Sequence, residues 1–460
     1  MTELQRCSVF TMAMMAFMTF RCDALFADDS GSVIDIGSRR ELFVDQYLID
    51  RLVNVTLKLH EPKLASEMTL TANTLEYGTV IVDGALFRLY TRDARGAKAD
   101  GDATEVTRYC ESQDGIHWTK PKLGLHEIDG SKENNVILAE PPYCHNFSPF
   151  LDRRPGVPAS QRFKALAGLH DSGLVAFVSG DGIHWQKLQQ EPVIPTRVPW
   201  TSRKLFDSQN VSFWSEAEKC YVCYFRSHVR GLRRIARTTS DDFHTWSEPL
   251  LLDVNFPGEH LYTSQTHPYF RAPHIYLALP TRYFPDRGSS TDILFMSARG
   301  DRPFDRSFRQ AFIRPGLNPS RWGNRSNYAA VNVVPTGPTE MSIYATPMRR
   351  FVLRTDGFVS VHAGAEQGEM ITRPLRFTGR KLLVNYSTSA GGSLQVEIQN
   401  GNGKPIPGFS LTDVERLVGD SIEQRVEWSN SSKLASLVGQ TVRLRFILQD
   451  ADLYAIQFRN

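Results

Sequence analysis

The chain has few cysteines, almost no net charge and no long apolar run after its first residues. Four of its six cysteines lie beyond residue 27: Cys110, Cys144, Cys220 and Cys223. One disulfide among these four is possible in an exported protein, and spacing does not assign it. Cys220 and Cys223 lie in a strand-like run, where side chains three apart point to opposite faces. No metal or redox chemistry is therefore expected at this pair, and no cofactor or bound metal is expected elsewhere.

The near balance of charge excludes a nucleic-acid partner. The 53 Lys and Arg residues face 50 Asp and Glu, for a net charge of +3, and a nucleic-acid footprint would need basic residues clustered on one face. No stretch after residue 27 is long and apolar enough for an integral membrane span. With 460 residues and 41% hydrophobic content, the chain suits one large and one small globular domain.

Residues 1–27 are typical of a secretory signal peptide. Arg6 stands in a short polar start, Ser8 to Phe20 is apolar, and Leu25-Phe26-Ala27 offers a cleavage site. The apolar run is shorter than the roughly 20 residues of a membrane span, and Arg21 closes it. We expect a secreted or periplasmic protein.

One short motif recurs about every 60 residues, which is typical of an array of supersecondary units. Ser-x-Asp-Gly-Ile-His-Trp occurs at 112–118 and 179–185, and 240–246 is a third copy with Phe243 in place of Gly. Ser and Asp side chains stabilise tight turns, and Gly supplies a positive φ. The motif therefore predicts a turn between outer strands, closed by its Trp. Asp114 and Asp181 as catalytic groups are the less favoured alternative.

Around these turns, five units of about four short strands each are expected, with little helical periodicity. Runs of β-branched and aromatic residues are bounded by turn signals such as Asp83-Gly84. The last unit is predicted to hold strands at 328–334, 341–345, 350–353 and 358–361. We predict an all-β fold: a five-bladed β-propeller over 28–367. A pair of β-sandwiches or a β-helix is the competing architecture.

Near Gly368 the motif disappears. Residues 368–460 alternate polar and apolar side chains over five runs, with turn signals at Asn400-Gly401 and Asn402-Gly403. This pattern predicts a small β-sandwich that serves as an accessory domain.

Polar residues open the first strand of each predicted blade, where a propeller presents one mouth of its channel. A sugar-cleaving site needs two carboxyl groups and polar side chains to hold hydroxyl groups. The catalytic candidates are Asp207, Glu259, Glu76 and Glu340. The substrate-binding candidates are His145, Asn146, Asn210, Arg226, Arg282 and Arg325.

We expect Asp207 and Glu259 to face each other, with Glu259 as the proton donor. Each candidate also has a structural interpretation. Glu259 follows Pro257-Gly258 and could cap a turn, and any single arginine could form a surface ion pair. Three arginines at one mouth would favour an anionic sugar.

The chain resembles the five-bladed propeller glycosidases of the invertase, levansucrase and arabinanase group. It resembles more closely a group of exported propeller proteins of planctomycete-type bacteria that are related to glycoside hydrolase family 32. The resemblance extends over most of the chain after residue 38. The segments that carry it are 41–49, 206–210, 259–262, 314–316, 353–361, 383–386, 396–398 and 451–454. The Asn-Asp-Pro-Asn-Gly, Arg-Asp-Pro and Glu-Cys motifs of the invertases are absent from the sequence. Their catalytic residues are therefore not transferred, and fructan cleavage is not supported.

The resemblance implies an exported glycoside hydrolase that acts on a poly- or oligosaccharide. Two alternatives stay open. A carbohydrate-binding module without catalysis would present fewer than two carboxylates at the mouth. A sialidase-like enzyme is suggested by the similar Ser-x-Asp-x-Gly-x-x-Trp turn of that family. The oligomeric state is not predicted.

Overall fold

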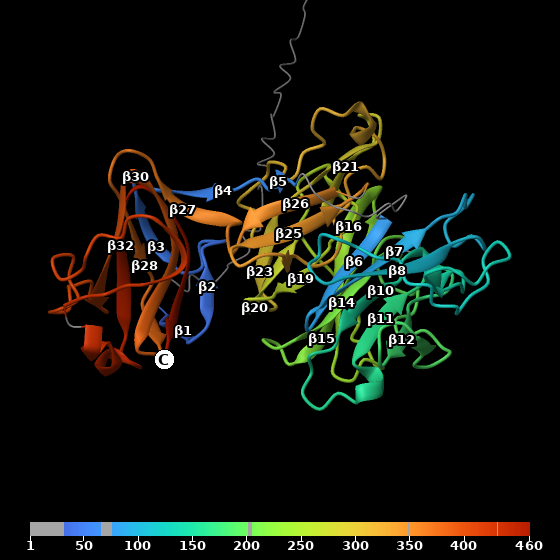
Figure 1. Ribbon diagram of the computed structural model, residues 1–460, viewed down its shortest axis with the longest axis horizontal. Helices are drawn as coiled ribbons and strands as arrows, with labels where there is room; N and C mark the ends of the chain where they lie inside the picture. The colour runs from blue at the N-terminus through green and yellow to red at the C-terminus, as the bar shows by residue number, and fades with distance from the viewer. Residues whose placement is uncertain (1–31, 66–75, 201–204, 348, 430) are drawn as a thin grey trace, which may run out of the picture.

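The computed structural model describes residues 32–65, 76–200, 205–347, 349–429 and 431–460, and it is nearly all β (Figure 1). The predicted signal peptide, residues 1–27, lies outside the described residues. Four short 3-10 helices occur among the described residues: η1 (Tyr143–His145), η2 (Ala159–Gln161), η3 (Pro319–Arg321) and η4 (Ser431–Leu437). No helix in this part of the chain is long and apolar enough to cross a membrane.

Three four-stranded antiparallel sheets follow one another along the chain. The first holds β6 (Glu76–Asp83), β7 (Leu86–Asp93), β8 (Val106–Ser112) and β9 (Val136–Leu138). The second holds β10 (Ser148–Leu151), β11 (Phe163–Ala167), β12 (Val175–Ser179) and β13 (Gln186–Lys187). The third holds β14 (Val211–Ser215), β15 (Cys220–Val229), β16 (Leu232–Ser240) and β17 (Leu250–Leu251).

The next unit is split into two three-stranded sheets, and the last borrows a strand from the N-terminal region. One small sheet holds β18 (His260–Leu261), β21 (Thr281–Phe284) and β22 (Ser290–Ile293); the other holds β19 (His267–Tyr269), β20 (Ala272–Ala278) and β23 (Met296–Arg299). The last sheet holds β24 (Val334–Pro335), β25 (Glu340–Ala345), β26 (Arg349–Arg354) and β5 (Lys63–Leu64).

The first strands of these sheets lie side by side in sequence order. Strand β10 contacts β6 and β14, β14 contacts β19, and β24 returns to contact β6. Two backbone hydrogen bonds help to join the last unit to the first: Val80 N donates to Val331 O at 3.1 Å, and Val331 N donates to Gly78 O at 2.9 Å. Sheets far apart in the sequence therefore lie around a common centre, and we call this arrangement of sheets the ring.

The repeated motif forms the predicted turn. Ser112 Oγ accepts a hydrogen bond from Gly115 N at 2.9 Å, and Asp114 Oδ1 accepts from the backbone N of Ile116 and His117 at 2.7 and 2.8 Å. The Trp118 indole donates to Gly115 O at 3.1 Å. The same bonds recur at Ser179 to Trp185 and at Ser240 to Trp246. Asp114 and Asp181 are thus used by their own turns, as the structural interpretation predicts.

A ten-stranded sheet takes strands from both ends of the chain and lies beside the other sheets (Figure 1). Its N-terminal strands are β1 (Ile34–Gly37), β2 (Arg40–Leu42), β3 (Ile49–Val53) and β4 (Thr56–Leu59). Its C-terminal strands are β27 (Val359–Ala363), β28 (Gly368–Thr372), β29 (Leu375–Phe377), β30 (Lys381–Asn400), β31 (Asp420–Arg425) and β32 (Val442–Arg459). One core of buried side chains, including Phe43, Met370 and Phe446, unites the two groups.

The segment 358–361 differs from its predicted place in the fifth unit. Strand β27 pairs with β4 and β32 in the ten-stranded sheet, and β5 takes the outer position next to β26. The pairings of β27 with β4 and of β26 with β5 join residues about 300 apart in the sequence, and that of β27 with β32 joins residues about 90 apart, so a local pattern does not reveal them. The domain boundary predicted at residue 368 stays a prediction. All four described cysteines are free thiols.

Candidate active site

A cluster of polar and aromatic side chains lies where the first strands begin. Tyr77 is the second residue of β6, His145 ends η1 just before β10, and Asp207 precedes β14. The rings of Tyr77 and Tyr328 stack at 5.9 Å, that of Tyr262 lies 5.3 Å from Tyr328, and that of His145 lies 5.6 Å from Tyr77. Segments in or beside the first strands of all five units therefore contribute to one site.

Asp207 is the carboxylate at the centre of this site. Its Oδ2 accepts a hydrogen bond from Arg226 on β15, and its Oδ1 lies 3.7 Å from His145 Nε2. The side chain keeps 22% of its exposure. Burial would raise the pKa of Asp207, but His145 and the Arg226 guanidinium outweigh it and hold that pKa well below its usual range. Asp207 is thus a carboxylate that is still open to solvent.

The backbone that carries Asp207 is strained. Phe206, fully buried, has φ +62°, a conformation that a bulky side chain rarely adopts. Asn146 Nδ2 donates to Phe206 O at 2.6 Å, and Asn210 Nδ2 donates to the same oxygen at 3.2 Å. Both asparagines are fully buried. They hold the bend that presents Asp207, which is a positioning role and not the sugar contact predicted from the sequence.

Arg226 brings unused donors to the site. Its guanidinium is 3% exposed and lies 4.6 Å from the centre of the Tyr262 ring. Burial lowers its pKa, but Asp207 and the neighbouring tyrosines outweigh burial and raise it. Among the described residues, Nε and Nη1 of Arg226 have no hydrogen-bond partner. A buried cation with two unused donors is suited to bind a polar ligand.

His145 is held in place by the buried ion pair between Arg92 and Glu105. Its Nδ1 lies 3.1 and 3.2 Å from the Glu105 oxygens, and Arg92 binds Glu105 at 2.5 Å and Glu76 at 3.2 Å. Gly101 N also lies 3.3 Å from Nδ1, which would require the opposite tautomer. We assign the proton to Nδ1, because two carboxylate oxygens lie closer. Burial would lower the pKa of His145, but Asp207 and Glu105 raise it.

The side chains at the outer edge of the site, which we call its rim, are more exposed than the tyrosines buried beneath them, which we call its floor. Arg325 Nη2 lies 3.6 Å from Asp100 Oδ1, and these two side chains are 39% and 44% exposed. Glu76, at 16%, completes the rim. Burial would lower the pKa of Arg325, but Glu76 and Tyr77 raise it. Tyr77, Tyr262 and Tyr328 form the buried floor.

Two glutamines close the centre of the ring beneath this floor. Gln209 Nε2 donates to Thr79 Oγ1 at 2.8 Å, and Gln265 Nε2 donates to Gln209 Oε1 and Ala329 O at 2.6 Å. Both amides are buried. A ligand therefore reaches Asp207 from the side of Asp100 and Arg325.

Three candidate residues make their contacts elsewhere. Glu259 binds Arg306 through both oxygens at 3.0 Å. Arg282 binds Asp292 at 2.7 Å. Its neighbours on β21 face the site, because the Thr281 hydroxyl accepts from Thr263 Oγ1 at 3.2 Å and the Tyr283 ring lies 5.8 Å from that of Tyr262, so alternation places Arg282 on the other face. No contact among the described residues joins Glu259 to Asp207, and the expectation that these two face each other is not supported.

Glu340 lies at the far end of its strand from the site. It binds Arg350 at 3.0 Å at the start of β25, whereas Thr346, just beyond the other end, bonds to Tyr328 of the floor. Six residues of strand separate the two positions, which at about 3.3 Å per residue is about 20 Å.

Several site residues were not predicted from the sequence: Tyr77, Arg92, Asp100, Glu105, Tyr262 and Tyr328. Asp100 belongs to the polar Ala94–Thr104 segment between β7 and β8, and the polar character of this segment is the signal that would have found it. The tyrosines lie within three residues of the candidates Glu76, Glu259 and Arg325 in the sequence, and a search restricted to charged side chains does not find them.

Neither a family model nor a curated protein matches this chain. Solved structures do resemble it. A glycoside hydrolase family 43 arabinoxylan arabinofuranohydrolase from Bacillus subtilis has a TM-score of 0.42 and 14% identity over 85% of this chain and 97% of its own. An endo-arabinase from Bacteroides thetaiotaomicron scores 0.39 with 10% identity, over 63% of this chain and 96% of its own. The catalytic domain of a Coprinopsis cinerea family 62 α-L-arabinofuranosidase scores 0.41 with 9% identity, over 66% and 98%.

These neighbours are glycoside hydrolases, the class that the sequence resembles. Their TM-scores are all below 0.5, so the function is inferred from the residues of this chain.

Proposed function

We propose that this protein is an exported glycoside hydrolase that cleaves a poly- or oligosaccharide at the mouth built around Asp207. The observation that carries the proposal is the Asp207 carboxylate, 22% exposed beside the unused donors of Arg226. Export rests on the signal-like sequence of residues 1–27.

The proposed architecture is a five-bladed propeller followed by a β-sandwich. Five successive units with neighbouring first strands support the propeller, and so does β5, which completes the last sheet from the N-terminal side. A last blade that combines both ends of the propeller segment would close the ring and leave only short sheet edges. The ten-stranded sheet, with its own core, is then the accessory domain.

Sugar cleavage needs a second carboxyl group near the first. Glu76 supplies it in this proposal, because Arg92, Glu105 and His145 link it to Asp207 through consecutive contacts. One group would assist departure of the leaving oxygen, and the other would act on water or on the sugar carbon. Arg226 and Arg325 would hold the substrate.

An anionic sugar is the favoured substrate class. Arg226 keeps two donors unused, Arg233 lies 4.7 Å from the Tyr262 ring, and Arg325 stands at the exposed rim. Guanidinium groups bind carboxylates in bidentate fashion. Uronic-acid-containing glycans should therefore be cleaved in preference to neutral ones.

The test is a screen of neutral and uronic-acid glycans with product analysis, repeated with Asp207→Asn. Loss of an essential catalytic group should lower kcat by about 10³-fold or more, while Asp253→Asn, in an exposed ion pair with Arg234, should retain full turnover. Glu76→Gln, which removes a less central carboxylate, provides a second variant if Asp207→Asn unfolds.

Two outcomes would reject the hydrolase. Normal turnover in Asp207→Asn and Glu76→Gln would remove the site from catalysis. Glycan binding without cleavage by the unaltered protein would favour the carbohydrate-binding module.

A further inference from the structure

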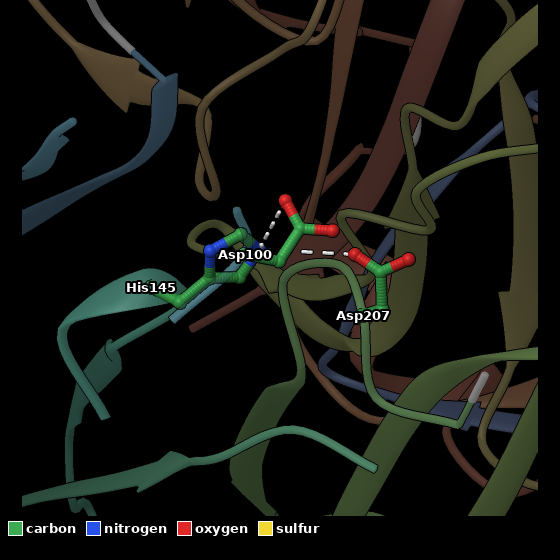
Figure 2. A group of neighbouring side chains, drawn as sticks. All are labelled: Asp100, His145 and Asp207. Atoms are coloured by element: carbon green, nitrogen blue, oxygen red, sulfur yellow. Dashed lines mark ion pairs between the residues drawn. The ribbon is translucent and has the colours of Figure 1, made fainter. Parts of the chain in front are cut away.

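Three side chains of the kinds that bind metal ions, those of Asp100, His145 and Asp207, face one another across a small gap at the rim of the site (Figure 2). Asp100, His145 and Asp207 each direct one nitrogen or oxygen atom toward the others, and these three atoms lie within 4.8 Å of one another. They come from three separate segments: the loop between β7 and β8, η1, and the bend before β14. The ring thus assembles the group from distant parts of the chain.

The decisive atom is His145 Nε2. The imidazole is 1% exposed, and Nε2 has no hydrogen-bond partner among the described residues. It lies 3.7 Å from Asp207 Oδ1 and 3.9 Å from Asp100 Oδ1. Both distances exceed the roughly 2.7–3.2 Å of a hydrogen bond. A buried nitrogen that is aimed at two carboxylates without bonding to either is unusual, because buried polar atoms are nearly always paired.

A divalent metal ion would fill this gap. Zinc binds His nitrogen and carboxylate oxygen at about 2.0–2.2 Å, so ligand atoms at a tetrahedral angle lie about 3.4 Å apart. The two separations from His145 Nε2 need to close by only a few tenths of an ångström. The Asp100 and Asp207 oxygens lie within 4.8 Å of each other, so Asp100, whose side chain is exposed, would make the larger shift. One His and two carboxylates leave the fourth position open to water or a sugar oxygen.

The surrounding groups match a metal site. With its proton on Nδ1, His145 donates to Glu105 and turns its Nε2 lone pair toward the gap, the arrangement by which carboxylates orient metal-binding histidines. Glu105 is in turn fixed by Arg92. Asp207 divides its two oxygens, with Oδ2 on Arg226 and Oδ1 free for the ion.

We propose that Asp100, His145 and Asp207 bind one divalent transition-metal ion, with zinc preferred over calcium because imidazole is a zinc ligand whereas calcium prefers an all-oxygen shell. The ion would contact the carboxylate proposed to act on the substrate, so its role as a regulator of hydrolysis rests on the proposed function. Binding itself does not depend on that function.

The test is calorimetric titration of the full chain with zinc chloride and calcium chloride after removal of metals with EDTA. We expect one zinc ion per chain and much weaker calcium binding. Asp100→Asn should weaken zinc binding at least tenfold, and the matched exposed variant Asp253→Asn should bind as the unaltered protein does. His145→Ala should abolish binding, and Asp100→Asn keeps the test valid if the buried substitution unfolds the chain. Absence of saturable zinc binding, equal binding by Asp100→Asn, or stronger binding of calcium would overturn the proposal.

An assay of glycan hydrolysis tests the regulatory role of the ion separately from its binding. Zinc that occupies Asp207 Oδ1 should inhibit glycan cleavage over the concentration range in which it binds, and Asp100→Asn should need at least tenfold more zinc for the same inhibition. Zinc binding without inhibition would support the metal site and reject the regulatory role together with the catalytic role of Asp207. Cleavage without zinc binding would reject the metal site and leave the hydrolase standing.

Discussion

Glu41 should make the protein acid-sensitive, and its contribution can be calculated. This fully buried carboxylate on β2 binds Arg299 on β23 at 2.5 Å and His274 on β20 at 3.2 Å, so it joins the ten-stranded sheet to the ring. Burial would raise the pKa of Glu41, but Arg299 and His274 outweigh burial and lower the pKa from 4.5 to about 2.

A depressed pKa stabilises the folded state above the unfolded pKa, and this stabilisation is lost as the pH falls through the folded pKa. At 1.36 kcal/mol per pKa unit, the Glu41 shift corresponds to roughly 3 kcal/mol at pH 7 and roughly 1 kcal/mol at pH 3. Protonated Glu41 resembles glutamine in shape and charge. Glu41→Gln should therefore cost roughly 3 kcal/mol at pH 7, and the difference from the unaltered protein should shrink as the pH falls.

Urea unfolding at pH 7, 5 and 3 measures this difference. We expect nearly equal values at pH 7 and 5 and less than half of that value at pH 3. Glu133→Gln is the control, because its carboxylate pairs with Lys122 at the surface, where ion pairs contribute at most about 1 kcal/mol. A Glu41→Gln penalty that is the same at pH 3 as at pH 7 would refute the assigned ionisation.

Two further predictions concern the repeated turn. Gly115→Ala should destabilise the fold by about 2 kcal/mol or more, because a Cβ there would lie 2.8 Å from the Tyr344 hydroxyl. Gly124 has a similar φ, but a Cβ there would meet no atom within 4 Å. Urea unfolding of Gly115→Ala and Gly124→Ala therefore separates the steric contact from the backbone strain. Phe243→Gly should relieve about 1–2 kcal/mol of backbone strain at φ +69° but lose about 3–5 kcal/mol of aromatic packing on Tyr221 and Trp246, so the variant should be less stable in urea. A more stable Phe243→Gly protein would show that the strain is the larger effect.

The turns and most ring strands could be predicted because their causes are local. Ser112 and Asp114 bond within their own heptapeptide, and this chemistry is visible in the sequence. The place of β27 depends on β4, about 300 residues away. Glu259 accepts a hydrogen bond from Phe256 N at 3.1 Å, the local turn cap that the sequence suggested, but its ion-pair partner Arg306 lies 47 residues away and is not visible in a local pattern. A pattern of residues predicts where a strand begins but does not predict which cation its first carboxylate binds.

The site itself shows how one short segment can serve two purposes. Between Phe206 and Asn210 every side chain is buried except that of Asp207, which is the most exposed. Gln209 closes the centre of the ring, Ser208 donates to Tyr262 O at 3.0 Å, and Asn210 bonds back to Phe206 O. Polarity in this segment therefore has mostly a structural cause, although the segment also carries the carboxylate of the candidate site. Because Asn210 fixes the strained bend and Gln209 closes the centre of the ring, Asp207 is the one side chain of the segment that is free to meet a ligand.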